Sequence, residues 1–354
     1  MKTLLTMDDP GPGVCGSEVY AVKLAQALAG AGLPVDLLVD CLNNSLGPVA
    51  GKSKRPERPV EEVFRSLPGF VKPLGRSREQ VTVVHRASLP DYRVINVHGT
   101  GQQAFLAVAS GRPTVVTVHG YDRRRLDHPV LRSQATLVAV GREQATELER
   151  DGFRVRAIIP PGVDLTRFCP GPADESALDI PPGAKVILHV GQLIPRKNVK
   201  LLLRAARRVR RSVELVVVVI GDGPLLPALR ALAEQLEIGP QIRFVPHVPH
   251  DALVSYYRRA DATVVPSLAE SFSLVSLEAM SCGSPLIVSH AVGEIVREFS
   301  GIGVFDPRSE SQLADAIVSV LDHEPDGVDP ARLAEFDWTK VALRYAALFA
   351  TLDG

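Results

Sequence analysis

Short apolar runs alternate with segments of helical periodicity along almost the whole chain of 354 residues. This alternation is typical of βαβ units, in which helices join parallel strands and cover both faces of a sheet. The strands expected in the first half are 3–7, 35–39, 81–84, 94–98, 114–119, 137–140 and 157–160. Those expected in the second half are 185–190, 214–220, 242–245, 263–266, 286–289 and 303–305. The sequence therefore predicts an α/β protein with two doubly wound, Rossmann-like domains.

The rhythm of strands and helices breaks in a segment rich in proline and glycine between Asp164 and Gly183. Such segments mark domain boundaries. We expect a first domain over 1–163 and a second over 164–337, followed by an amphipathic helix within 338–354. Two open α/β domains that face one another leave a cleft at the carboxyl ends of their strands, where ligands bind.

The composition excludes several classes of protein. A formal net charge of zero argues against a nucleic-acid partner. The four cysteines are scattered without a Cys-x-x-Cys pair, which argues against a metal site or a disulfide framework and fits a reducing compartment. No apolar run reaches membrane-spanning length, and the N-terminal run is too short for a signal peptide. We expect a cytoplasmic protein, with a solvated loop over 41–80. A membrane-surface or acceptor-binding element is the alternative for this segment.

The segment 266–285 combines a loop, a helix and a helix stop between two expected strands. The loop carries Glu270, the helix is expected to begin near Ser273, and Gly283 ends it. Glu278 lies on this helix, eight residues after Glu270. The spacing alone is also compatible with a helix-cap role for Glu270 and a solvated surface position for Glu278.

The start of this helix favours a polyhydroxylated, anionic ligand. Backbone N–H groups of Phe272, Ser273 and Leu274 are expected beside the Glu270 carboxylate. Carboxylates accept hydrogen bonds from sugar hydroxyls, and helix N-termini receive phosphate groups. A nucleotide sugar has both parts.

A glycine-rich turn joins the first strand to the first helix. Gly11, Gly13 and Gly16 are spaced so that backbone N–H groups can approach a phosphate. A plain tight turn is the simpler interpretation. A dehydrogenase would also need an acidic residue after the second strand, for which Asp40 is the only candidate.

Two histidines end expected strands of the first half. His98 and His119 are each followed by glycine, and at the carboxyl ends of parallel strands both are expected to point into the cleft rather than the core. Structural histidines are the alternative. Arg123 and Arg124 follow closely and are candidates to bind an acceptor phosphate or carboxylate, unless they are solvated loop residues.

A loop with two cations follows the first strand of the second half. It begins at Gly191 and carries Arg196 and Lys197 before a helix expected over 199–208. Fixed cations and helix N–H groups can stabilise a leaving diphosphate without a metal ion. Solvated basic residues at a helix start are the alternative.

Together these segments resemble the retaining glycosyltransferases of the GT-B fold, in the large family 4 that uses nucleotide-activated sugars. The segments that carry the resemblance are 159–164, 190–197, 220–224, 260–267 and the pair Glu270 and Glu278. The family usually has arginine where this chain has Gln192, which removes one cation from the diphosphate loop. The resemblance also implies that the last helix crosses back onto the first domain.

The resemblance assigns roles to individual residues. Glu270 would contact the hydroxyls of the donor sugar, and Glu278 the ribose diol. The residues it places at the donor are Gly16, Gly191, Gln192, Arg196, Lys197, Gly221, His247, Glu270, Ser271, Phe272, Ser273, Leu274 and Glu278. The candidates for catalysis are Glu270, His98, His119, Arg196 and Lys197, with Arg123 and Arg124 on the acceptor side.

The expected activity is transfer of a sugar from a nucleoside diphosphate sugar, such as a UDP or GDP sugar, to a hydroxyl acceptor with retention of configuration. No metal or other cofactor is expected. The acceptor is a small molecule, a glycan or a lipid-linked sugar. A nucleotide-sugar epimerase of the same fold and a non-catalytic nucleotide-sugar-binding subunit are the alternatives.

Overall fold

The computed structural model describes residues 2–7, 16–39, 81–84, 92–98, 102–120, 129–173, 180–181, 183–210, 213–246, 248–323 and 327–352. The chain divides into two compact units. Unit 1 comprises Met1–Gly162 together with Asp337–Gly354, and unit 2 comprises Val163–Phe336. The segment 41–80, expected to be a solvated loop, lies outside the described residues.

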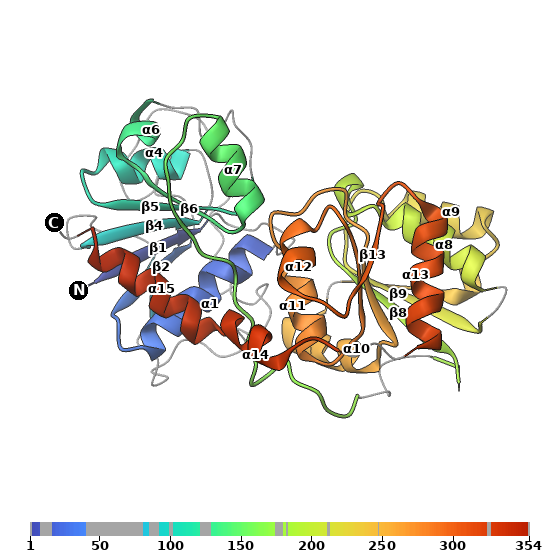
Figure 1. Ribbon diagram of the computed structural model, residues 1–354. Coiled ribbons are helices and arrows are strands. Elements are labelled where there is room, and N and C mark those ends of the chain that lie inside the picture. Colours follow the sequence, from blue (N-terminus) through green and yellow to red (C-terminus); the bar gives the residue numbers. More distant parts are fainter. Residues whose placement is uncertain are drawn as a thin grey trace. The chain divides into compact units, whose positions relative to one another are not determined.

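Unit 1 is built on a seven-stranded parallel sheet with the order β3-β2-β1-β4-β5-β6-β7. Its strands are β1 (Thr3–Met7), β2 (Val35–Val39), β3 (Val81–Val84), β4 (Val94–His98), β5 (Thr114–Val118), β6 (Thr136–Ala139) and β7 (Val155–Ile158). Its helices are α1 (Gly16–Gly30), α4 (Gln102–Ala109), α6 (Pro129–Gln134), α7 (Arg142–Arg150) and α15 (Trp338–Ala350). Figure 1 shows α4, α6 and α7 on one side of this sheet and α1 and α15 on the other.

The last helix belongs to unit 1 although 174 residues of unit 2 precede it, from Val163 to Phe336. The side chain of Asp337 caps α15 by accepting a hydrogen bond from the Thr339 N–H. The apolar face of α15 packs against α1, and Tyr345 is fully buried there. The expectation that this helix returns to the first domain is confirmed.

Unit 2 is built on a six-stranded parallel sheet with the order β10-β9-β8-β11-β12-β13. Its strands are β8 (Lys185–Val190), β9 (Leu215–Ile220), β10 (Ile242–Val245), β11 (Ala262–Val265), β12 (Leu286–Ser289) and β13 (Gly303–Phe305). Its α-helices are α8 (Val199–Val209), α9 (Leu226–Gln235), α10 (Leu253–Arg259), α11 (Leu274–Ser281), α12 (Gly293–Glu298), α13 (Glu310–Asp322) and α14 (Pro330–Leu333). Short 3₁₀ turns are η3 (Pro195–Lys197), η4 (Gly239–Gln241), η5 (His250–Ala252) and η6 (Ala334–Phe336).

Both faces of this second sheet are covered by helices (Figure 1). Alternate residues of β8 serve the two faces: Leu188 packs in one apolar core with α10, α11 and α12, and Ile187 packs in the other with α8, α9 and α13. The six residues of β9 are all buried, which explains why its sequence is a continuous apolar run.

The strand order confirms the doubly wound prediction and fixes where ligands are expected. In unit 1 the order reverses between β1 and β4, and in unit 2 between β8 and β11. Ligands of open α/β sheets bind beyond the carboxyl ends of the strands at this switch point. In unit 2 the segments that leave the switch point are the loop after β8 and the loop after β11, which carry the predicted cations and Glu270.

Candidate functional site

Two glycine-containing loops pack backbone to backbone beyond β8 and β9. The Gly191 N–H donates to the Ile220 carbonyl at 3.0 Å, and the Leu193 N–H donates to the Asp222 carbonyl at 2.8 Å. Gly221 has a φ of 138°, and a Cβ there would overlap the carbonyl oxygen of Gly191. Glycine is therefore required at position 221 both by conformation and by space.

Glu270 joins the predicted cations in one cluster. Its Oε1 accepts from the Lys197 ammonium at 2.5 Å and from the Ser267 hydroxyl at 2.8 Å. Its Oε2 accepts from the Arg196 guanidinium at 2.8 Å. The Glu270 side chain is 7% exposed and Lys197 is 17% exposed, whereas Arg196 is 46% exposed. Arg196 is thus the partner with most freedom to move.

Asn198 holds the cation loop in place. Its backbone is left-handed, with φ of 54°, at the start of α8. Its side-chain amide donates to the carbonyls of Pro266 at 3.1 Å and Pro307 at 2.9 Å. The Leu268 N–H also donates to the Arg196 carbonyl at 2.8 Å. The bonds to Pro266 and from Leu268 join the loop after β8 to the loop after β11 and fix the distance between the cations and Glu270, and the bond to Pro307 joins the same loop to the segment after β13.

The pKa of Glu270 is lowered by this arrangement. Burial alone would raise it, but the charges of Lys197 and Arg196 and the hydrogen bonds from Lys197 and Ser267 outweigh burial. Glu270 is therefore a carboxylate near neutral pH. A carboxylate engaged by two cations is a weak base and a weak nucleophile, and it remains a good acceptor for hydroxyl groups.

His189 lies beside this cluster and was missed by sequence reasoning. It is the one polar residue inside strand β8, which begins with Lys185, and it is 1% exposed. Its Nδ1 donates to the Val264 carbonyl at 3.0 Å, and its buried Nε2 has no partner among the described residues. Nε2 lies 3.5 Å from the point where a Cβ at Gly191 would be. Burial lowers the pKa of His189 to about 4, so the ring is neutral. A lone histidine inside an apolar strand was the available signal.

Glu278 belongs to a second, buried cluster. Its Oε1 contacts His250 Nε2 at 2.6 Å, and its Oε2 accepts from the Tyr257 hydroxyl at 2.9 Å. The Glu278 side chain is 6% exposed. The alternative of a solvated helix position for Glu278 is therefore wrong. The sequence offers no signal for these partners, because a tyrosine at helical spacing looks like ordinary core.

The start of α11 agrees with the expected helix start. Ser273 is the N-cap, and its hydroxyl oxygen accepts from the Ser276 N–H at 3.2 Å. Capping leaves other first-turn amides, including those of Leu274 and Val275, without intrahelical partners. Phe272 packs against the apolar core that contains Leu188 and Phe336, and the ring centroids of Phe272 and Phe336 are 5.7 Å apart. Gly283 follows the helix with φ of 81°, as its stop requires.

The two predicted histidines of unit 1 contact each other. His98 Nδ1 lies 3.0 Å from His119 Nε2, and the rings are stacked with centroids 5.3 Å apart. His98 is only 3% exposed and packs against Tyr20, so the expectation that it points away from the core is wrong. His119, just beyond the end of β5, is partly exposed.

A chain of hydrogen-bonded polar groups determines which nitrogen of each ring carries the proton. Thr117 donates to Asn96 Oδ1 at 3.0 Å, which leaves the Asn96 amide nitrogen facing His98 Nε2 at 3.2 Å. Burial, with a smaller effect of His119, holds the pKa of His98 well below its usual range, and burial lowers that of His119 to about 3. Both rings are neutral, so His98 accepts at Nε2 and donates from Nδ1 to His119 Nε2. His119 then presents Nδ1–H as a donor.

The chain continues into the last helix. The Tyr345 hydroxyl lies 2.9 Å from Thr117 Oγ1 and 3.1 Å from the Tyr20 hydroxyl. The Tyr20 hydroxyl also donates to the Ile159 carbonyl at 3.2 Å. Helix α15 is thereby hydrogen-bonded to β5, the strand that precedes His119, and is linked through Thr117 to Asn96 on β4.

Other predicted residues are less informative. His247, Arg123 and Arg124 lie outside the described residues. Gly16 is the first residue of α1, and Gln192 is exposed on the loop after β8. Within the described residues, no group of three or more His, Cys, Asp and Glu side chains is placed to hold a metal ion. In the same residues, no helix has the length and apolar character needed to cross a membrane.

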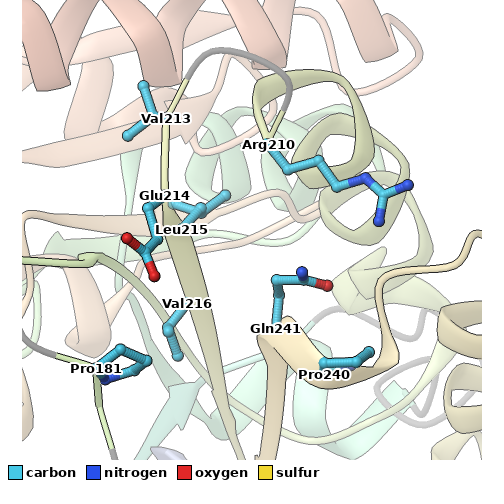
Figure 2. Close-up of a pocket in the computed structure, with 8 residues that line it drawn as sticks. All are labelled: Pro181, Arg210, Val213, Glu214, Leu215, Val216, Pro240 and Gln241. Atoms are coloured by element: carbon cyan, nitrogen blue, oxygen red, sulfur yellow. The ribbon is translucent and has the colours of Figure 1, made fainter.

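A pocket of about 590 Å³ lies away from this chemistry. Figure 2 shows its lining, which comes from the segment before β8, from the start of β9 and the residues before it, and from the residues before β10. The residues are Pro181, Arg210, Val213, Glu214, Leu215, Val216, Pro240 and Gln241. These lie at the amino ends of the strands, opposite the end that carries Gly191, Gly221 and Glu270.

Two family models match the chain. The one described as "Glycosyltransferase Family 4" matches residues 14–167, and the one described as "Glycosyl transferases group 1" matches residues 172–335. A D-inositol 3-phosphate glycosyltransferase of Catenulispora acidiphila is 31% identical, over 97% of this chain and 88% of the relative. One from Geodermatophilus obscurus is 33% identical, over 89% of this chain and 80% of the relative.

Solved structures match over the same length. Sucrose-phosphate synthase from Thermosynechococcus elongatus has a TM-score of 0.73 at 23% identity, covering 99% of this chain and 98% of the other. Anabaena HepE, solved with UDP and glucose, has a TM-score of 0.67 at 17% identity, covering 100% and 97%. At these identities the likeness concerns the fold.

Proposed function

Because the chain belongs to the group 1, family 4 glycosyltransferases, we propose that it moves a sugar from a nucleoside diphosphate sugar to a hydroxyl acceptor with retention of configuration. The observation that carries this proposal is the cluster of Glu270, Lys197 and Arg196 at the switch point of the unit 2 sheet. It combines an ionised acceptor for sugar hydroxyls with two cations for a diphosphate.

The cluster suggests how a donor is accommodated. A carboxylate offers about four lone-pair positions, and Lys197, Ser267 and Arg196 use three of them at Glu270. One position remains for a sugar hydroxyl. Arg196 is the most exposed partner, so it can turn toward the diphosphate and release a second position, while the better buried Lys197 stays. Arg196 then takes the place of the arginine that the family usually has at the position of Gln192.

The reaction breaks the bond between the anomeric carbon and the diphosphate oxygen, and the acceptor oxygen bonds to the same face of that carbon. The acceptor proton passes to the leaving diphosphate. Lys197 and Arg196 stabilise the charge that develops there, so no metal ion is needed. The lowered pKa of Glu270 supports a role in binding sugar hydroxyls rather than as a covalent nucleophile.

Relatives and neighbours indicate which ligands to test first. The relatives named above are D-inositol 3-phosphate glycosyltransferases, so a phosphorylated inositol is the first acceptor to test. HepE was solved with UDP-glucose. Another structural neighbour, the catalytic domain of starch synthase IV from Arabidopsis thaliana, was solved with ADP. Uridine and adenosine diphosphate sugars are therefore the first donors to test. We assign His119 to the acceptor and Glu278 to the ribose of the donor.

Thermal unfolding with UDP, GDP and ADP tests donor binding, because a ligand of the native state raises the melting temperature. The matching nucleotide sugars are then incubated with inositol phosphates, and the released diphosphate is measured. We expect one nucleotide to stabilise the protein and its sugar to be transferred. The double variant Arg196→Ala and Lys197→Ala should keep the fold and lose transfer. No stabilisation by any nucleotide, or full transfer by the double variant, would contradict the proposal.

A further inference from the structure

The Glu278 cluster is built from two donors that hold one carboxylate. A carboxylate only accepts, so both Tyr257 and His250 donate to it, through the hydroxyl and through Nε2–H. These donors come from α10 and η5, and Glu278 comes from α11. Burial, together with the charge and hydrogen bond of Glu278, raises the pKa of Tyr257 well above its usual range, so the hydroxyl stays protonated.

The two donors leave room for two more hydrogen bonds. His250 occupies one lone pair of Oε1 and Tyr257 one lone pair of Oε2. One lone pair remains on each oxygen. A ribose 2′,3′-diol has two hydroxyl donors on adjacent carbons, which matches one free acceptor position on each oxygen. A 2′-deoxyribose has only one of these donors.

His250 has no other polar role in the described part of the chain. Its Nδ1 is buried without a partner, and its ring packs against Phe168 with centroids 5.0 Å apart. An unsatisfied buried polar atom lowers stability and calls for an explanation. Orientation of Glu278 by Nε2–H supplies one, because an apolar residue at this position would fill the same space without leaving Nδ1 unpaired.

We propose that His250 and Tyr257 are positioning residues that orient the Glu278 carboxylate to select ribonucleotides over 2′-deoxyribonucleotides. The proposal rests on the proposed function, since it assumes that unit 2 binds a nucleoside diphosphate at Glu278. It concerns the sugar of the nucleotide and is independent of the transferred sugar and of the acceptor.

The test compares dissociation constants of the folded full chain for UDP, GDP or ADP, whichever binds, and for its 2′-deoxy counterpart by titration calorimetry. A hydrogen bond to a charged group is worth about tenfold or more in affinity. We expect the wild type to prefer the ribonucleotide at least about tenfold. Tyr257→Phe and His250→Leu should reduce this preference to about twofold. His250→Gln, which keeps an N–H near the Nε2 position, should retain most of it.

A matched control is available one residue away. Tyr256 lies on the same helix, and within the described residues the partners of Glu278 are His250 and Tyr257, so Tyr256→Phe should keep the full preference. If Tyr257→Phe fails to fold, the pair His250→Leu and His250→Gln decides. A purely structural role would weaken both nucleotides equally and leave their ratio unchanged, which would overturn the inference.

The two possible failures are distinguishable. If the wild type binds no nucleoside diphosphate, the proposed function fails, and the inference with it. If the wild type binds one but does not discriminate against its deoxy form, the inference fails while the proposed function stands.

Discussion

Glu270 is the residue on which the proposed donor site depends. A glutamine at this position would keep the shape of the side chain but lose its charge, and with it the strong hydrogen bonds to Lys197, Arg196 and a sugar hydroxyl. Losing one charge-assisted hydrogen bond costs about 1.5–3 kcal/mol. We therefore expect Glu270→Gln to keep the fold and to lower turnover at least tenfold in a steady-state transfer assay. A folded variant with near-normal turnover would contradict this role.

Two histidines with lowered pKa values make the stability of the protein depend on pH. His119 and His189 have pKa values lowered to about 3 and about 4, against about 6.5 in the unfolded chain. Their folded pKa is depressed, so the stability they contribute is present above pH 6.5 and is lost as the pH falls toward the folded pKa. Each adds a slope of about 1.4 kcal/mol per pH unit.

We expect the free energy of unfolding, measured in urea, to fall between pH 6.5 and pH 4.5. His189→Leu should reduce the slope of unfolding free energy against pH by about 1.4 kcal/mol per pH unit, the contribution of one histidine. This holds whatever the substitution does to the stability at pH 7.5. The window lies above the range in which Glu270, with its lowered pKa, takes up a proton. An unchanged slope in the variant would show that His189 is not held neutral.

His119 is expected to act on the acceptor, and His98 to fix its tautomer. His98→Leu removes the donor to His119 Nε2 and should lower kcat/KM for the acceptor at least fivefold, while nucleotide affinity changes less than twofold. Tyr345→Phe is the matched control, because it breaks the chain beyond Thr117 and leaves the Asn96–His98–His119 contacts in place. Nitrogen-15 spectra of the histidine rings report the tautomer. Unchanged acceptor kinetics in His98→Leu and His119→Ala would make both residues structural.

At the scale of elements, the loops after β8 and β9 depend on each other. Gly221→Ala would place a Cβ against the Gly191 carbonyl and displace the loop that carries Lys197. Gly183→Ala is the control, since Gly183 also has a positive φ of 82° but has nothing within 4 Å of its Cβ position. The control should cost about 1–2 kcal/mol in stability, the strain of that conformation alone. Gly221→Ala should cost more and also weaken nucleotide binding. Equal effects in both variants would contradict the packing argument.

The elements were more predictable than their ends and their side-chain contacts. Strands such as Lys185–Val190 and Val94–His98 coincide with their prediction, because buried parallel strands are rich in apolar residues. The seventh strand, expected over 157–160, is Val155–Ile158, because it lies at a sheet edge where its side chains are only partly buried and give a weaker pattern. The pairing of Glu270 with Lys197 joins residues 73 apart, and no local pattern encodes it.

At the scale of the whole molecule, the strand order 3-2-1-4-5-6 recurs in both units although no sequence repeat is evident. The recurrence explains why the fold could be predicted: each unit obeys the same rules of right-handed βαβ connection. The buried partners of Glu278 and the orientation of His98 could not be predicted. They depend on which helix face packs on the sheet. Sequence reasoning assumes that polar side chains face solvent, and these buried polar side chains do not.

The central claim is retaining transfer in which protein groups stabilise the leaving diphosphate. The measurement that tests it most directly is a proton NMR time course of the purified chain with its donor and acceptor in excess EDTA, read at the anomeric proton of the product. We expect transfer to proceed in the chelator, with one diphosphate released per product and with the anomeric coupling of the donor retained. An inverted anomeric coupling, or transfer that stops in EDTA and returns with magnesium, would contradict the account.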